Sequence, residues 1–265
     1  MRSMDIRTKE QLVEELRTIR SQSWIPNARP GNVGGVGNTL EDLLGIQENN
    51  LPIPNAAEWE LKCRREDSSS LGTLFHMEPS PRALKFVPKI FLLKYGWPHE
   101  EAGKKHPQNE MSFRQTINAL SRTDRGFGVV VNRDERKIKI SFDSQVVDER
   151  HSTWLASVRE EVGLGELNPQ AYWGFDDLIH KAGTKLKNCF FVIAKRKIEN
   201  GVEHFLYDKI FMFQGFGGER FISAIQNGNI LIDFDSRTHH NHGTKFRVRR
   251  VENLCDIYEV ARVIE

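Results

Sequence analysis

The stretch EDLLGIQENNLPIPNAAEWELK, residues 41–62, decides how we interpret the rest of this sequence. Its end, AEWELKC at residues 57–63, alternates between apolar and polar side chains, and this period of two predicts a β-strand with one buried face. In such a strand Glu60 and Lys62 point to the same side of the sheet. The predicted strand therefore carries a Glu-x-Lys pair on its polar face.

A short helix is predicted upstream of this strand. Residues 40–44 follow Asn38 and Thr39, either of which can cap a helix, and a glycine ends the segment. Two prolines then break the chain before the strand begins. Glu41 lies on the predicted helix, and Asn55 lies between the breaker and the Glu-x-Lys pair.

Metal-dependent phosphodiester hydrolysis uses this order of residues, with an acid at the position of Asn55. Two carboxylates hold Mg²⁺, which polarises a phosphoryl oxygen and lowers the pKa of a bound water. A lysine beside them orients that water and stabilises negative charge in the transition state. Glu and Lys are common residues, however, and such a pair taken alone more often simply faces solvent. Two interpretations therefore stay open, a catalytic site and an exposed strand face.

The composition is that of a globular protein with room for one or two domains. The chain has 265 residues, of which 38% are hydrophobic. It has no run of about 18 apolar residues that predicts a membrane-spanning helix, and its N-terminus lacks the apolar segment of a secretory signal. Cys63, Cys189 and Cys255 are too few and too far apart for a disulfide framework or a Cys-x-x-Cys zinc site. We therefore expect a protein of the reducing cytosol with no membrane partner.

Helical and strand patterns are mixed along the chain. Helices are predicted at residues 8–19, 111–121, 148–162, 176–186, 219–226 and 254–263. Strands are predicted at 128–131, 137–142, 189–197, 205–213, 229–234 and 245–250, with the first two forming a hairpin. Because no regular βαβ rhythm appears, the order favours an α+β fold or a mixed sheet over a doubly wound parallel sheet.

The charge distribution is uneven although the net charge is only +2. Two tracts, residues 181–197 and 236–250, contain Lys and Arg but no acidic residue. A chain with such local tracts can hold a polyanion such as nucleic acid at one face. A solvated charged surface is the alternative.

Several segments of the sequence resemble the MvaI/BcnI group of type II restriction endonucleases. They are GNTLEDLLGI (37–46), ENNLPIP (48–54), EWELKCRRE (58–66), TLFHMEPSP (73–81) and DFDSRTHHNHGTKFRVR (233–249). The group shares the catalytic core of the MutH mismatch-repair nickase. Its members have a helix glutamate, an acid after a proline and Glu-x-Lys in this order, and the combination is far more specific than Glu-x-Lys alone.

The resemblance implies an α+β fold, with a mixed-sheet core of the MutH/restriction-endonuclease type and a second lobe that recognises DNA. Residues 1–200 would form mainly the catalytic lobe and residues 201–265 mainly the recognition lobe. It also implies a monomer that cuts double-stranded DNA one strand at a time, at a C/G-rich site of the CC-N-GG type. The expected context is a restriction-modification system in a prokaryotic cytoplasm, with a cognate DNA methyltransferase that forms no stable complex with the chain.

The resemblance assigns catalytic roles within the first block. Mg²⁺ would bind Glu60, the Leu61 carbonyl and the acid at position 55. Lys62 would orient the attacking water, and Glu41 would support the metal or the water. The sequence departs from the group at Asn55, where the group has aspartate. An amide supplies one oxygen but no negative charge, so the affinity for Mg²⁺ should fall steeply.

Two explanations of Asn55 are open. One is a substitution that inactivates the enzyme, which we favour because the rest of the site is intact and Asp→Asn is nearly isosteric. The other is a natural member with weak or absent cleavage. Two further functions stay open beside the endonuclease: a non-cleaving, sequence-specific DNA-binding module, and a MutH-like nickase that a partner protein activates.

The second block has residue types that read base edges. The fork of an arginine matches guanine O6 and N7, and an aspartate can accept from cytosine N4. Asp235 and Arg237 alternate at the end of a strand and are predicted to read a C·G pair together. His240, His242 and Arg247 are predicted to make further base or phosphate contacts.

Other residues are predicted at the DNA backbone and the central base pair. His76 resembles the group's histidine that approaches the central pair, and a packing role is its alternative. Arg64, Arg65 and Lys245 are predicted to contact phosphates. Plain surface charge is the alternative for these three.

Overall fold

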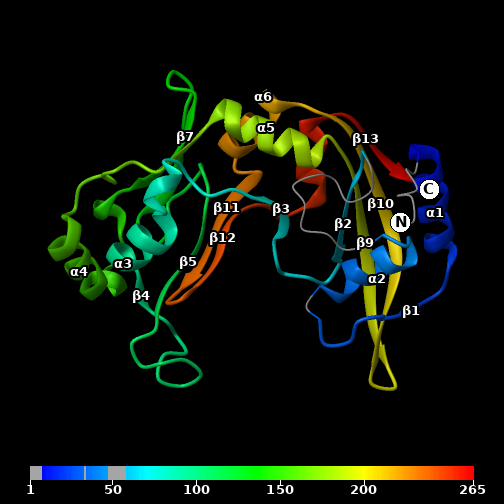
Figure 1. Ribbon diagram of the computed structural model, residues 1–265, viewed down its shortest axis with the longest axis horizontal. Helices are drawn as coiled ribbons and strands as arrows, with labels where there is room; N and C mark the ends of the chain where they lie inside the picture. Colours follow the sequence, from blue (N-terminus) through cyan, green and yellow to red (C-terminus); the bar gives the residue numbers. More distant parts are fainter. Residues whose placement is uncertain (1–7, 33, 47–57) are drawn as a thin grey trace. The chain divides into compact units, whose positions relative to one another are not determined.

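The computed structural model describes residues 8–32, 34–46 and 58–265, so the predicted metal ligand Asn55 lies outside the described residues. The chain forms two compact units, and each is assembled from separate segments (Figure 1). Unit 1 comprises Met1–Gly72, Ala182–Gly218 and Arg250–Glu265, and unit 2 comprises Thr73–Lys181 and Glu219–Arg249. The division therefore does not fall at residue 200, and the assignment of catalysis and recognition to the lobes stays a prediction.

Unit 1 is built on a five-stranded sheet with the strand order β1-β10-β9-β2, in which β13 also pairs with β10. Its elements are α1 (Lys9–Ser21), β1 (Ile25–Pro26), α2 (Gly35–Leu43), β2 (Glu60–Arg65), β9 (Asn188–Glu199), β10 (Val202–Phe216), η5 (Val251–Ile257), β13 (Tyr258–Ile264) and the last part of α5 (Phe175–Leu186). β9 and β10 form a long antiparallel hairpin, and β2 joins β9 in parallel. The sheet is therefore mixed, as predicted.

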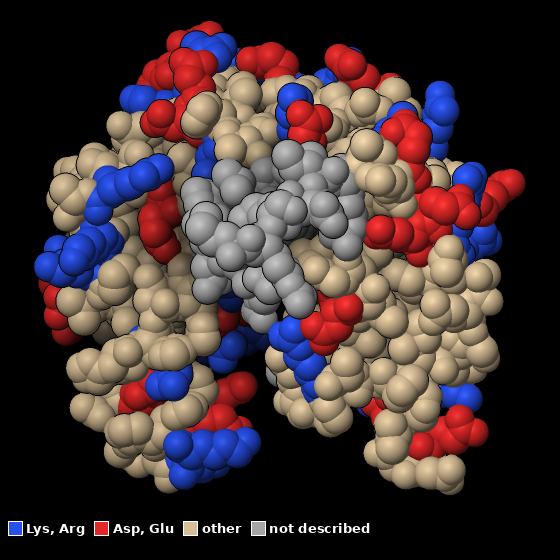
Figure 2. Space-filling view, turned by 45° about the vertical axis from the view of Figure 1, so that its right-hand side comes forward, with Lys and Arg blue, Asp and Glu red and all other residues tan. Residues whose placement is uncertain are grey.

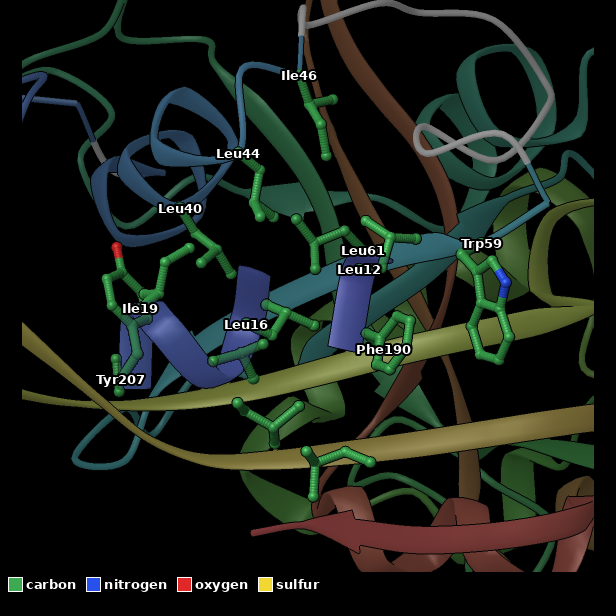
Figure 3. Close-up of a cluster of buried hydrophobic side chains, with 14 of the residues drawn as sticks. Leu12, Leu16, Ile19, Leu40, Leu44, Ile46, Trp59, Leu61, Phe190 and Tyr207 are labelled. Carbon is green, nitrogen blue, oxygen red and sulfur yellow. The ribbon is translucent and has the colours of Figure 1, made fainter. Parts of the chain in front are cut away.

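The two N-terminal helices cover one face of this sheet. α1 buries Leu12, Leu16 and Ile19, which recur at helical spacing. Figure 3 shows these side chains meeting Leu40 and Leu44 of the α2 segment above the strands. Leu61 of β2, Phe190 of β9 and Tyr207 of β10 complete the cluster from the sheet. This core fixes which face of β2 is left for other contacts.

A capping box starts α1, and we expect its loss to destabilise the protein modestly. The Thr8 hydroxyl accepts from Gln11 N at 3.2 Å, and Thr8 N donates to Gln11 Oε1 at 2.8 Å. Replacing such a cap by alanine costs about 1 kcal/mol. Urea unfolding of Thr8→Ala should show this loss, whereas Thr8→Ser keeps the hydroxyl and should unfold with the parent chain. An unchanged midpoint for Thr8→Ala would contradict a stabilising role of the cap.

Unit 2 contains a five-stranded sheet of order β3-β12-β11-β5-β4 and a three-stranded sheet of order β6-β7-β8. Its strands are β3 (Gly72–His76), β4 (Trp97–Pro98), β5 (Met111–Ile117), β6 (Phe127–Asn132), β7 (Lys137–Phe142), β8 (Tyr172–Gly174), β11 (Ile230–Arg237) and β12 (His240–Val248). Its helices are η1 (Arg82–Leu84), η2 (Val87–Phe91), α3 (Leu92–Tyr95), η3 (Ser144–Val146), η4 (Glu149–His151), α4 (Ser152–Val162), the first part of α5, and α6 (Gly218–Gln226).

Aromatic side chains form the core of unit 2. The Phe91 ring stacks on Phe113 at a centroid distance of 5.1 Å and meets Phe234 edge-on at 5.7 Å. All three rings are buried. Phe234 belongs to the buried face of β11, so the next residues on either side of it point to the opposite face of the sheet. That opposite face carries the predicted base-reading residues.

Two helix predictions are wrong. Residues 111–117 form strand β5, and of the helix predicted at 254–263 only 254–257 are helical, in η5, while residues 258–264 form strand β13. Phe113 and Ile117 are four residues apart, a spacing that one face of a helix and one face of a strand both allow. Antiparallel pairing of β5 with β11 and of β13 with β10 decides both cases in favour of strands.

The helix before the predicted metal site starts earlier than predicted. α2 begins at Gly35, after the cap residue Gly34, so Asn38 and Thr39 lie inside it. The Thr39 hydroxyl accepts from Ala28 N at 3.1 Å instead of capping the helix. The hairpin β6–β7, helices α1, α4, α5 and α6, and strands β2, β9, β10, β11 and β12 confirm the other element predictions. None of the described helices has the length and apolar character needed to cross a membrane.

Candidate active site and DNA-recognition face

Glu60 and Lys62 contact each other on one face of β2. Lys62 Nζ lies 2.6 Å from Glu60 Oε1, and the Glu60 side chain is only 3% exposed. Leu61, which alternates with them, packs on the opposite face in the helix-covered core. The predicted strand face is therefore correct, and the solvent-exposed alternative for this pair is wrong.

Lys185, on the last turn of α5, reaches the same carboxylate and was not predicted. Its Nζ lies 3.0 Å from Glu60 Oε2, and its side chain is 19% exposed. Burial raises the pKa of the nearby Cys189 thiol to about 12, and the charges of Lys62, Glu60 and Lys185 all act on that thiol. No local sequence pattern links a helix residue to a distant strand; membership of the basic tract 181–197 was the only signal.

The Glu60 carboxylate has the character of a ligand for a hard cation. Its Oε2 is buried and, apart from the ion pair with the Lys185 ammonium at 3.0 Å, accepts no hydrogen bond from a described residue. Mg²⁺ prefers such oxygens and is usually held by one or two carboxylates plus waters. Within the described ranges, no three His, Cys, Asp or Glu side chains gather closely enough to hold a metal ion. Glu60 therefore fits the predicted ligand set, of which Asn55 lies outside the described residues.

The other predicted residues of the first block are spread over both faces of the sheet. Glu41 is half-buried on α2. Burial of the Cys63 thiol on β2 raises the pKa of that thiol, and the charge of Glu41 raises it further. Arg64 NH2 donates to Ser68 O at 2.7 Å. Arg65 lies on the helix-covered face and pairs with Glu203 at 3.4 Å. Arg64 and Arg65 therefore point to opposite faces of the sheet, as neighbouring residues of a strand do.

The basic tract 181–197 is largely paired with acids in unit 1. The pairs are Lys195 with Asp208 at 2.9 Å, Arg196 with Glu203 at 2.5 Å and Lys197 with Glu199 at 2.7 Å. Figure 2 likewise shows Lys and Arg interspersed with Asp and Glu on the visible face. Residues 195–197 therefore form a charged surface of mixed sign and not a uniformly basic face for a polyanion.

Asp235 and Arg237 lie on the polar face of the five-stranded sheet of unit 2. Buried Phe234 and Ser236 alternate with them along β11. Asp235 accepts from two neighbouring strands: Arg114 Nε lies 2.8 Å from its Oδ1, and Lys245 Nζ lies 2.8 Å from its Oδ2. Burial opposes ionisation of this carboxyl, but the hydrogen bond and charge of Lys245 and the charge of Arg114 lower its pKa overall. Asp235 is therefore an ionised acceptor.

Arg237 is held by a buried acid that the sequence did not reveal. Its NH1 lies 2.8 Å from Oε1 of Glu110, which is 4% exposed. The hydrogen bond from Arg237 lowers the pKa of Glu110, so the carboxylate stays charged at neutral pH. Pairing of Arg237 with Ser112 across β11 and β5 brings the segment before β5 to this site.

A second polar row runs beside the first. Asp233 accepts from Thr116 at 2.7 Å and pairs with Arg247 NH1 at 3.1 Å. Arg247 Nε also donates to Thr73 Oγ1 at 3.1 Å, which ties β12 to β3. The structure thus brings Arg247 and Lys245 onto the face that carries Asp235 and Arg237.

The predicted histidines lie at the exposed end of the same sheet. His240 and His242 are exposed on β12, with ring centroids 4.1 Å apart. Burial of its ring atoms lowers the pKa of His242. The charge of Asp235 opposes this shift, and the charges of His240, Lys245 and Arg114 add to it. His76 is exposed at the end of β3, next to β12 in the sheet. All predicted readers of the second block, together with His76, therefore belong to one sheet.

Comparison with known proteins supports one family. The model of the MvaI/BcnI restriction endonuclease family matches residues 13–258. A solved structure of restriction endonuclease MvaI in complex with its cognate DNA substrate has a TM-score of 0.75 at 24% identity, over 97% of this chain and 98% of that one. Restriction endonuclease MvaI in the absence of DNA gives 0.52 at 24% identity, over 96% of each chain. The search of curated proteins returned no match. Because the family model spans nearly the whole sequence, this chain belongs to the MvaI/BcnI restriction endonuclease family of type II site-specific nucleases.

Proposed function

We propose that the chain is a Mg²⁺-dependent endonuclease that hydrolyses duplex DNA at a short C/G-rich site of the CC-N-GG type. The observation that carries the proposal is the contact at 2.6 Å between buried Glu60 and largely buried Lys62, on the face of β2 opposite the helix-covered core. A carboxylate kept out of water beside an ammonium is poorly explained as a surface pair but suits metal-assisted hydrolysis. The solved MvaI complex with cognate DNA supports duplex DNA as the substrate.

The chain's own residues divide the chemistry between them. Glu60, the Leu61 carbonyl and residue 55 as aspartate would hold Mg²⁺, with Glu41 supporting the metal or the water. The ion supplies Lewis acidity and a more acidic water when bound. Lys62, whose ammonium Glu60 keeps in place, would orient the attacking water and offset negative charge as phosphorus is attacked. The products are a 5′-phosphate and a 3′-hydroxyl.

Recognition is proposed on the polar face of the five-stranded sheet in unit 2. Arg237 and Asp235 would read a C·G pair, one as a guanine-binding fork and the other as an acceptor for cytosine N4. Arg247, His240 and His242 would add base or phosphate contacts. His76 would approach the central pair, and Lys245, Arg64 and Arg65 would contact phosphates.

The proposed enzyme acts as a monomer and cuts the strands in turn. One active site must reorient to reach the second strand, so nicked DNA accumulates before linear DNA. We place the protein in a prokaryotic cytoplasm, in a restriction-modification system whose DNA methyltransferase forms no stable complex with it. Simultaneous cleavage of both strands by a stable dimer would contradict the monomer.

The test uses a duplex with one CC-N-GG sequence and the Asn55→Asp variant. With Mg²⁺ we expect discrete fragments with 5′-phosphate ends, and with EDTA we expect none. Fragments in EDTA, or cleavage spread evenly along the duplex, would contradict the proposal.

Asn55 favours one second candidate, a DNA-binding module that does not cleave. That function predicts tight binding of a specific duplex and no cleavage when Asn55 becomes aspartate. A MutH-like nickase stays open as well, and it predicts that the purified Asn55→Asp protein needs an activating partner. Cleavage by the purified variant alone argues against both.

Loss of the Glu110 carboxylate should weaken recognition because Arg237 loses the anchor that orients its fork. We expect Glu110→Ala to reduce affinity for a CC-N-GG duplex by about tenfold, the size typical of a lost charge-assisted hydrogen bond. Glu110→Gln keeps an acceptor and should lose less. Anisotropy titrations in EDTA measure both, and equal affinities of Glu110→Ala and the parent chain would contradict the role.

A further inference from the structure

Two ammonium groups share one buried carboxylate in unit 1. Lys62 Nζ lies 2.6 Å from Oε1 of Glu60, and Lys185 Nζ lies 3.0 Å from Oε2. Both lysine side chains are about four-fifths buried, since they are 20% and 19% exposed. The two oxygens therefore have different cations, and only Lys62 comes from the same strand as Glu60.

A divalent cation on Oε2 would compete with the Lys185 ammonium for that oxygen. Mg²⁺ binds carboxylate oxygens at about 2.1 Å, so the ion would lie closer to Oε2 than the ammonium does now. Two like charges at such a distance repel strongly where water is largely excluded. Lys185 has a flexible four-carbon stem and can leave, whereas Lys62 contacts the other oxygen.

We propose that Lys185 and the divalent cation compete for Glu60 Oε2, and that the displaced ammonium binds a DNA phosphate, so that metal and DNA bind cooperatively. The inference rests on the proposed function, because that function brings a phosphodiester to this carboxylate. Lysine binds phosphate readily as a point charge. Bound DNA then favours the conformation in which Lys185 has left Glu60, and a bound cation favours the same conformation.

Linkage makes the effect reciprocal. If a divalent cation raises the affinity for DNA by some factor, DNA raises the affinity for that cation by the same factor. Lys185 contributes to this factor only while it carries a charge and can reach both Glu60 Oε2 and a DNA phosphate. Lys185→Met should therefore tighten metal binding in the absence of DNA and reduce the cooperativity.

The experiment measures Mn²⁺ binding by calorimetry without DNA, in the Asn55→Asp background. We expect Lys185→Met to bind Mn²⁺ about tenfold more tightly, within the usual range of coupling between sites. Lys185→Arg keeps the charge and should stay near the parent value. Lys195→Met also removes a lysine that forms an ion pair in unit 1, and it should change nothing.

A second measurement tests the parent protein before any Lys185 variant. Anisotropy of a CC-N-GG duplex with Ca²⁺ and with EDTA gives the cooperativity of the parent, which Lys185→Met should reduce severalfold. If the parent binds Mn²⁺ and Lys185→Met binds it equally or more weakly, competition is refuted while the proposed function stands. The inference is also refuted if the parent binds the duplex with the same affinity in Ca²⁺ and in EDTA. If the Asn55→Asp protein binds no Mn²⁺ at all, the metal site itself is refuted, and the proposed function falls with it.

Discussion

Replacing Lys62 by alanine in the Asn55→Asp background is expected to lower the rate of Mg²⁺-dependent DNA cleavage by about 10³-fold. The loss should be large because, in the proposed mechanism, the ammonium acts where charge develops, in a site largely shielded from water. Removing one such group typically costs about 10²–10³ in rate. Lys62 Nζ lies 2.6 Å from Glu60 Oε1. A water molecule cannot take over its charge at this position. Single-turnover cleavage of a labelled duplex measures the effect.

Two controls separate a chemical role of Lys62 from a structural one. Affinity for the same duplex in EDTA should change little, because the lysine acts mainly on the reaction. Lys195→Ala removes an ammonium that pairs with Asp208 at 2.9 Å in the same unit, and it should cleave at the parent rate. Cleavage by Lys62→Ala at the parent rate would refute the role of the lysine.

The second large effect is expected from Arg237→Ala. If the Arg237 fork reads guanine, its loss should weaken binding of a CC-N-GG duplex by roughly 10²-fold, which corresponds to the upper part of the range for one bidentate base contact. Binding of a duplex without the site should change far less, because phosphate contacts remain. The ratio of the two affinities, measured at one salt concentration, reports this loss of discrimination.

Arg136→Ala is the matched control. Arg136 is an arginine of unit 2 that pairs with Asp176 at 2.7 Å and is half exposed, but it lies in the turn between β6 and β7. Its substitution should leave the affinity ratio unchanged. Equal loss of specific and non-specific binding in Arg237→Ala would identify Arg237 as a phosphate contact instead of a base reader.

Local sequence pattern predicted the parts of the site that depend on strand periodicity. Glu60 and Lys62 share a face because their side chains are two residues apart, and Asp235 and Arg237 share a face for the same reason. Along β11, buried Phe234 and Ser236 alternate with Asp235 and Arg237, which agrees with this period of two. Alternation alone thus placed both predicted pairs correctly.

Residues that reach the site from elsewhere in the chain could not be predicted. Lys185 comes from α5 and Glu110 precedes β5, and only tertiary pairing brings them to Glu60 and Arg237. The same cause produced the wrong helix at residues 111–121. Its apolar spacing suited a helix, but β11 offered an edge that β5 pairs with.

The most direct test of the central claim is a plasmid cleavage assay with Mg²⁺ that compares this chain with its Asn55→Asp variant. An aspartate at position 55 adds the negative charge that a Mg²⁺ site beside Glu60 requires. We predict discrete fragments from the variant, with nicked plasmid before linear plasmid, and little or no cleavage by the chain with Asn55. Two inert proteins that still bind a specific duplex would contradict the endonuclease, and equal cleavage by both would show that residue 55 is not a metal ligand.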